Sequence, residues 1–194
     1  MSTFTKFEQL SLEFGQEYGD YKTKVLNGSS GVSRKVELPE NVLLDFYFDG
    51  AFQIHMNPSD QDCMNCFNAR LEEVKIVLDE PNNCHFNFTH LGTEMQLRME
   101  NGFRRAETIK SLPESYSVTS GEISKDFNNR SPFANFFIEQ KSVDYVDCQK
   151  LPTEAEQKEC RYELRKKIKS ISVEFVISYI PNFPDQHEIC IVPE

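Results

Sequence analysis

The chain has 194 residues, a formal net charge of −10, 39% hydrophobic residues and 16 phenylalanines. This apolar content supports one sizeable hydrophobic core and argues against a disordered chain. The acidic balance disfavours binding to nucleic-acid phosphates, and no apolar run reaches the roughly 18–20 residues that span a bilayer. We expect one domain over residues 1–194, with no membrane span and no nucleic-acid partner. The negative charge of the chain is compatible with a basic protein partner.

The first predicted elements are short. Residues 4–14 fit neither the helical nor the strand period cleanly, so they predict an opening strand or a short helix. Residues 18–26 and 32–38 predict strands, separated by a loop rich in glycine and serine at 27–31. Pro39 ends the second of these strands.

Residues 42–56 predict a β-hairpin. Asp49 and Gly50 lie between two apolar, aromatic-rich runs, which is a strong short-range hairpin signal. A three-residue loop that ends at Gly50 places Phe46 opposite Phe52 and makes one face of the hairpin wholly apolar. Gly50 then takes the left-handed position, where it has no Cβ penalty. We expect this hairpin to be a central, buried element of the fold.

The middle of the chain predicts further strands. They cover residues 71–78, 84–91, 93–109, 115–123 and 132–143. The stretch 93–109 is a second hairpin, because it contains the favoured turn dipeptide Asn-Gly at 101–102. A two-residue loop there places Leu97 beside Ala106 and Arg98 opposite Arg105. Facing like charges are unfavourable, so we place this hairpin at or near a sheet edge.

One α-helix is predicted, over about residues 153–168. Thr153 and Glu156 form a capping box at its start. Acidic side chains fill the first turns and basic ones the last, as the helix dipole favours. A narrow apolar stripe follows the i, i+4 spacing and consists of Cys160, Leu164 and Ile168. The narrow stripe places the helix on the surface of the domain, with the basic run 161–169 as its solvated face.

The last part of the chain completes the fold class. Residues 171–179 alternate with period two and give the clearest single strand, and residues 189–192 predict a short closing strand. About ten short strands with one helix predict a mainly β protein, an antiparallel β-sandwich or barrel with one surface helix. The pattern leaves the choice between sandwich and barrel open.

Six cysteines, an even number, are candidates for a disulfide framework. They are Cys63, Cys66, Cys84, Cys148, Cys160 and Cys190. A bridge from Cys148 to Cys160 would tie the predicted helix to the loop before it, and a bridge from either one to Cys190 is the alternative. A zinc site at Cys63, Cys66, Cys84 and His85 is disfavoured, because adjacent residues on a strand point to opposite faces and four ligands must converge.

Cysteine usage and two sequons favour an extracellular, disulfide-bonded glycoprotein. Asn27 and Asn87 are the glycosylation candidates. Proline follows Asn57 and excludes it, and Pro132 weakens the sequon at Asn129. No apolar signal segment is visible at the start of the sequence, so we expect a mature secreted chain. The alternative is a cytoplasmic protein with buried free thiols.

No catalytic motif, phosphate-binding loop or metal-ligand pattern is present in the sequence, so we expect a non-enzymatic protein without a cofactor. The leading hypothesis is a secreted binding protein that engages a protein partner through loops or an acidic face. Asp60 and Asp62, in the polar loop 57–65, are the candidate contacts. The alternative is a carrier of a small, lipid-like hydrophobic ligand in a cavity lined by Phe and Met side chains.

Overall fold

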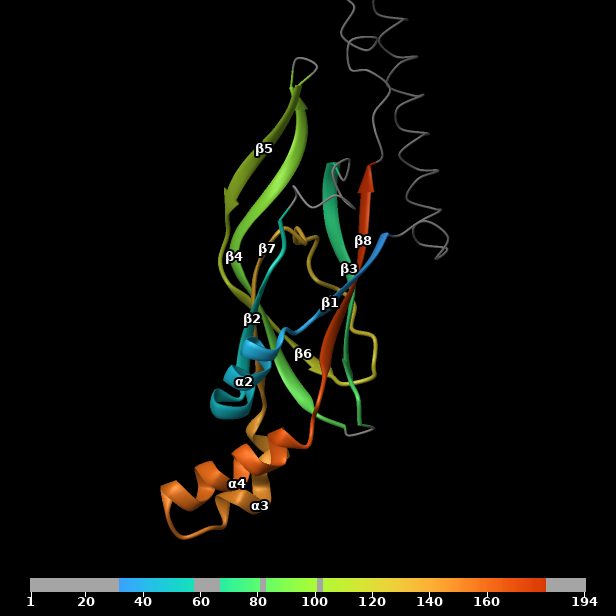
Figure 1. Cartoon of the computed structure of the whole chain (residues 1–194). Coiled ribbons are helices and arrows are strands. Elements are labelled where there is room, and N and C mark those ends of the chain that lie inside the picture. The colour runs from blue at the N-terminus through green and yellow to red at the C-terminus, as the bar shows by residue number, and fades with distance from the viewer. Residues whose placement is uncertain (1–31, 58–66, 81–82, 101–102, 181–194) are drawn as a thin grey trace, which may run out of the picture.

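The computed structural model describes residues 32–57, 67–80, 83–100 and 103–180 (Figure 1). Several predictions lie outside these residues and stay predictions. They are the elements at 4–14, 18–26 and 189–192 and the sites at Asn27, Asp60, Asp62, Cys63, Cys66 and Cys190.

The described residues form a mainly β protein, as the sequence predicts. The strands are β1 (Val32–Glu37), β2 (Ala51–His55), β3 (Phe67–Leu78), β4 (His85–Glu100), β5 (Phe103–Lys110), β6 (Glu114–Thr119), β7 (Ala134–Gln140) and β8 (Ile171–Ile180). The helices are α2 (Glu40–Asp49), the 3-10 turn η2 (Ser142–Tyr145), α3 (Val146–Gln149) and α4 (Glu154–Lys166). Among the described residues, no helix is both long enough and apolar enough to cross a membrane.

The eight described strands are hydrogen-bonded in the order β1-β8-β3-β4-β7-β2, with β5 and β6 also paired to β4. All pairs are antiparallel except β3 with β4, which meet in parallel at Phe67 and Leu97. This parallel pair joins two antiparallel halves of the sheet, β1-β8-β3 and the strands around β4, which face each other as a sandwich (Figure 1). The helices gather at one end of the sandwich, and the β4–β5 hairpin extends from the other.

Phenylalanine fills the space between the two halves. The Phe88 ring of β4 lies 5.0 Å from that of Phe136 on β7 and 6.3 Å from that of Phe175 on β8. Phe136 and Phe175 are 5.6 Å apart, centroid to centroid. Among the described residues, the fully buried phenylalanines are Phe46, Phe86, Phe88, Phe127, Phe133, Phe136 and Phe175. Ring-against-ring contacts of this kind add to the area that these side chains remove from water.

The predicted hairpin over residues 42–56 is wrong in its first strand. Residues 40–49 form α2, and Gly50 ends it with φ at 71°, its N–H donating to the Phe46 carbonyl at 2.8 Å. A helix forms here instead of a strand because Leu43, Phe46 and Tyr47 recur at helical spacing and are buried together. Asp-Gly therefore marks a helix end with a left-handed glycine rather than a β-turn.

The second half of that stretch is a strand, as predicted. Phe52, Ile54 and Met56 are buried, and β2 pairs with β7 instead of with the residues before it. The second hairpin is confirmed with its register, since Leu97 pairs with Ala106 and Arg98 with Arg105. It extends the long strand β4, so the predicted strands at 84–91 and 93–100 are one element.

The predicted surface helix is confirmed as α4, and its apolar stripe is partly wrong. The Thr153 hydroxyl accepts the Glu156 N–H, and the Glu156 carboxylate accepts the Thr153 N–H, both at 3.2 Å. Leu164 is 38% exposed, whereas Arg165 is only 6% exposed. The charged residue takes the buried position because its guanidinium finds hydrogen-bond acceptors there, which the hydropathy pattern does not encode.

Candidate functional site

The exposed side of α2 carries apolar and acidic side chains together. Leu44 and Phe48, one turn apart, are 45% and 67% exposed. Asp45 and Asp49 lie next to them and are also exposed. We call these four residues the α2 face. Leu44 and Phe48 lie opposite the buried Phe46, because 3.6 residues complete a helical turn, and the two acids lie beside Phe48.

One acid of the α2 face, Asp49, lies at the end of the helix where a negative charge is unfavourable. Asp49 is the last residue of α2, Asp45 lies one turn before it, and the last turn holds no basic residue. The C-terminal end of a helix carries partial negative charge, so a nearby acid there costs about 0.3–1 kcal/mol. Helix stability therefore does not explain why this end is acidic.

The aromatic ring of the α2 face is held in place. Phe48 stacks on Tyr162 of α4, with ring centroids 4.8 Å apart and an interplanar angle of 26°. Lys166 Nζ lies 4.8 Å from the centroid of the Tyr162 ring, at cation–π distance. An exposed aromatic side chain that is already fixed loses less conformational entropy when a partner covers it.

Arg165 of α4 binds the C-terminal end of α2. Its Nη1 donates to the carbonyls of Tyr47 at 3.1 Å and Phe48 at 3.2 Å. Its Nε donates to the Tyr145 hydroxyl at 2.8 Å. Carbonyls in the last turn of a helix have no partner within the helix, so this cation satisfies them and offsets the nearby acids.

A polar network continues from Arg165 into the sandwich. The Tyr145 hydroxyl donates to the Gln140 side chain, and Gln140 Nε2 donates to Asp144 Oδ2 at 3.0 Å. The Asp144 carboxylate also accepts the His85 N–H at 2.8 Å and lies 2.7 Å from His85 Nδ1. Burial raises the pKa of Tyr145 to about 12, so its hydroxyl remains a donor at neutral pH. The network joins α4 to β4 and β7.

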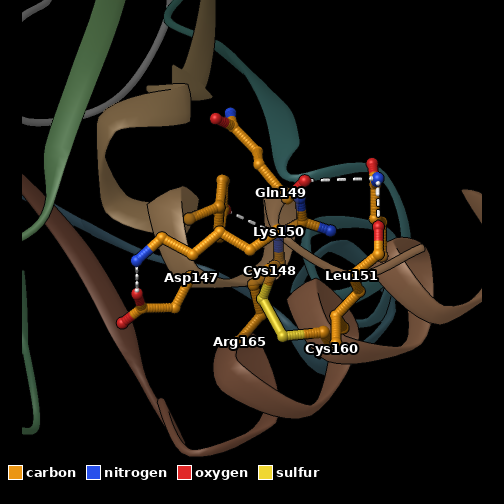
Figure 2. Close-up of a disulfide and its surroundings, with 9 residues drawn as sticks. Asp147, Cys148, Gln149, Lys150, Leu151, Cys160 and Arg165 are labelled. Carbon is orange, nitrogen blue, oxygen red and sulfur yellow. Dashed lines mark hydrogen bonds and ion pairs between the residues drawn. A yellow bond between two sulfur atoms is a disulfide. The ribbon is translucent and has the colours of Figure 1, made fainter. Parts of the chain in front are cut away.

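A disulfide holds α3 and α4 together. Cys148 and Cys160 are bonded, with 5.6 Å between their Cα atoms (Figure 2). This is one of the two pairings that the sequence left open, and it excludes Cys190 as a partner of either residue. In the chain-entropy model a loop of this length contributes about 2–4 kcal/mol. Figure 2 also shows the ion pair between Asp147 and Lys150, 2.8 Å long, and Arg165 on the helix that carries Cys160.

Cys84 is a buried free thiol. Burial raises its pKa to about 11, and the charge of Asp144 adds to the shift. A thiol of this kind is protonated at neutral pH and is neither a good nucleophile nor a ready metal ligand. His85 next to it is half-buried on the other side of the strand. The described residues contain no group of three or more His, Cys, Asp or Glu side chains that would hold a metal.

A second buried cluster surrounds His90. Its Nδ1 accepts the Gly92 N–H at 3.1 Å, so Nε2 carries the proton toward the Ser131 carbonyl, also 3.1 Å away. The Ser131 hydroxyl donates instead to the Met95 carbonyl at 2.6 Å. Burial raises the pKa of Glu94, but hydrogen bonds from His90 and the Ser131 N–H lower it below its usual value. The serine does not face the imidazole, so this cluster is not a nucleophile–base pair.

Sequence reasoning missed the α2 face and its anchor. Leu43, Phe46 and Tyr47 at i, i+3 and i+4, with Pro39 before and Gly50 after, are the signals that would have indicated the helix. Among the predicted sites, Asn87 is exposed on β4. No protein-family model matches the chain, and no curated protein matches its sequence.

Proposed function

We propose that this chain is a non-enzymatic, extracellular binding protein that presents the α2 face to a protein partner with basic side chains. The exposed Phe48, with two acids beside it on one side, carries the proposal. Aromatic side chains supply large contact area at protein interfaces, and the flanking acids complement a basic partner and speed its association.

The arrangement around the face supports this role. The stack on Tyr162 fixes Phe48, Arg165 fixes the backbone beneath it, and the disulfide ties α4 to α3. Binding sites that are rigid before the partner arrives gain affinity by avoiding ordering costs. Asp49, the last residue of α2, opposes the helix dipole, which is the kind of stability cost that a binding surface retains.

A selection with a random displayed peptide library tests the proposal. The library is panned against the full chain, and recovered peptides are measured against Phe48→Ala and against Asp45→Lys/Asp49→Lys. We expect peptides that combine Lys or Arg with apolar residues. Each variant should weaken their binding about tenfold or more, and added salt should slow their association.

A matched control reverses two exposed acids on elements that do not adjoin α2, Glu107→Lys/Glu122→Lys. This variant changes the net charge by the same amount and leaves the α2 face intact, so the peptides should bind it as they bind the wild type. Peptides that bind all variants equally, or that lack basic residues, contradict the proposal.

A further inference from the structure

We propose that Asn87 carries an N-linked glycan whose first sugar covers the ring of Phe137. This inference rests on the extracellular location proposed above and does not depend on the α2 face. It assigns a modification to the outer surface of the sandwich, on a different element from the helices.

The strand places the sequon outward. Phe86 and Phe88 on either side of Asn87 are fully buried, and side chains alternate along a strand. Asn87 and Thr89 therefore both point to the outer surface, where Asn87 is exposed. The Thr89 hydroxyl lies 2.7 Å from the Ser115 hydroxyl on β6. The acceptor amide and the hydroxyl of the sequon share one open surface.

The neighbours of Asn87 leave space for a sugar. The residue pairs with Ser117 of β6 on one side and with Glu139 of β7 on the other. Both residues are exposed. The small Ser117 side chain accepts a hydrogen bond at its hydroxyl from Lys141 Nζ, at 2.6 Å. A glycan on Asn87 therefore extends from the sheet without displacing a packed side chain.

Phe137 gives the glycan a surface to pack on. It is a half-buried aromatic residue on this otherwise polar surface, opposite Thr89 in the β4–β7 register and so diagonal to Asn87. Diagonal neighbours in a sheet are about 7–8 Å apart, within reach of an aromatic side chain. The C–H face of a sugar ring removes part of such a ring from water.

The sequon at Asn129 is a contrasting case. Asn129 has φ at 56°, its Ser131 is fully buried, and the Ser131 hydroxyl is committed to the Met95 carbonyl. Pro132 follows directly. The two residues of this sequon do not share a surface, so we assign the glycan to Asn87.

The reaction is a simple substitution. The side-chain amide nitrogen of Asn87 forms a bond to the anomeric carbon of the first sugar of a lipid-pyrophosphate-linked oligosaccharide, the donor of the secretory pathway. The bond from that carbon to the pyrophosphate oxygen breaks, the lipid pyrophosphate leaves, and the amide loses one proton. Nothing is oxidised or reduced, and the Asn-x-Thr pattern is what the transferase recognises.

The test expresses the full chain behind a secretion leader in a eukaryotic cell line. Intact masses and peptide maps are taken with and without a peptide-N-glycosidase, from both medium and cells, so that a poorly secreted variant is still measured. We expect a glycan on the peptide that contains Asn87. Asn87→Gln and Thr89→Ala should remove it, and Asn129→Gln should leave it in place.

A second measurement tests the packing on Phe137. Loss of the glycan in the neutral variant Asn87→Gln should lower the melting temperature by about 2–4 °C, and this difference should shrink when Phe137→Thr is added. An unmodified Asn87 in secreted, folded protein overturns the site, and an undiminished difference in Phe137→Thr overturns the packing. Neither result affects the peptide selection on the α2 face, which uses a different surface.

Discussion

Arg165 Nη1 donates to the Phe48 carbonyl at 3.2 Å, so a buried cation on α4 closes the C-terminal end of α2. The two residues are 117 positions apart in the sequence. Their contact decides where α2 ends and where its exposed aromatic side chain lies. The stability of this contact is therefore the first property to measure.

Replacing Arg165 by Met should destabilise the protein by about 3 kcal/mol, because buried acceptors lose their donor at about 1–3 kcal/mol each. The acceptors are the carbonyls of Tyr47 and Phe48 and the hydroxyl of Tyr145. Urea unfolding measures the change. Lys167→Met is the control, since Lys167 lies two positions after Arg165 and is exposed. This substitution should change the free energy of unfolding by about 0.5 kcal/mol or less. Equal effects of the two substitutions would show that Arg165 does not anchor α2.

Gly50→Ala should be more destabilising than Gly121→Ala. Both glycines have positive φ, 71° and 80°, so an alanine costs about 1–2 kcal/mol at either position. At Gly50 the added Cβ would also lie 2.5 Å from Arg165 Nη2, whereas nothing lies within 4 Å at Gly121. Arg165 cannot turn away without breaking its hydrogen bonds, so the Gly50 variant should lose roughly 2 kcal/mol more. Similar unfolding midpoints for the two variants would contradict this reading of the contact.

The elements that the sequence predicts correctly are those with complete local signals. The capping box of α4, the period-two pattern of β8 and the pairing of β4 with β5 involve residues close together in the chain. Each of these signals is complete within its own segment, so it can be recognised before the partners of the element are known. The mainly β class follows from the same strands.

The elements that it does not predict depend on distant partners. Residues 42–49 contain a period-two apolar pattern and a helical one at the same time, and Asp49-Gly50 fits either a hairpin or a helix end. Burial of Phe46 and Tyr47 against the core, and Arg165 beneath the last turn, select the helix. The buried Arg165 could not be predicted for the same reason, because its acceptors belong to α2 and η2.

Removing the Cys148–Cys160 disulfide with serine at both positions should cost about 2–4 kcal/mol of unfolding free energy. The loss should appear mainly as faster local opening of α3 and α4, which hydrogen exchange measures. The β4–β5 hairpin serves as the internal control, since it lies at the opposite end of the sandwich (Figure 1). A non-reducing peptide map should show one cross-linked peptide pair for these cysteines, and free thiols at both positions would contradict the assignment.

The free thiol of Cys84 predicts a loss of stability at alkaline pH. Burial raises its pKa in the folded protein to about 11, above the 9.0 of a free thiol. Below pH 9 both states keep the proton and the contribution is fully present. As pH rises toward 11 only the unfolded chain ionises, so folding becomes less favourable. Unfolding free energies measured by urea from pH 8 to pH 10 should fall with pH. They should fall less steeply in Cys84→Ala, because this variant keeps every tyrosine and loses only the thiol. Ser120→Ala is the matched control, because Ser120 accepts the Cys84 N–H at 2.9 Å but its replacement leaves the thiol in place. That variant should keep the wild-type slope, and a Cys84→Ala protein with an unchanged slope would show that another group controls the alkaline transition.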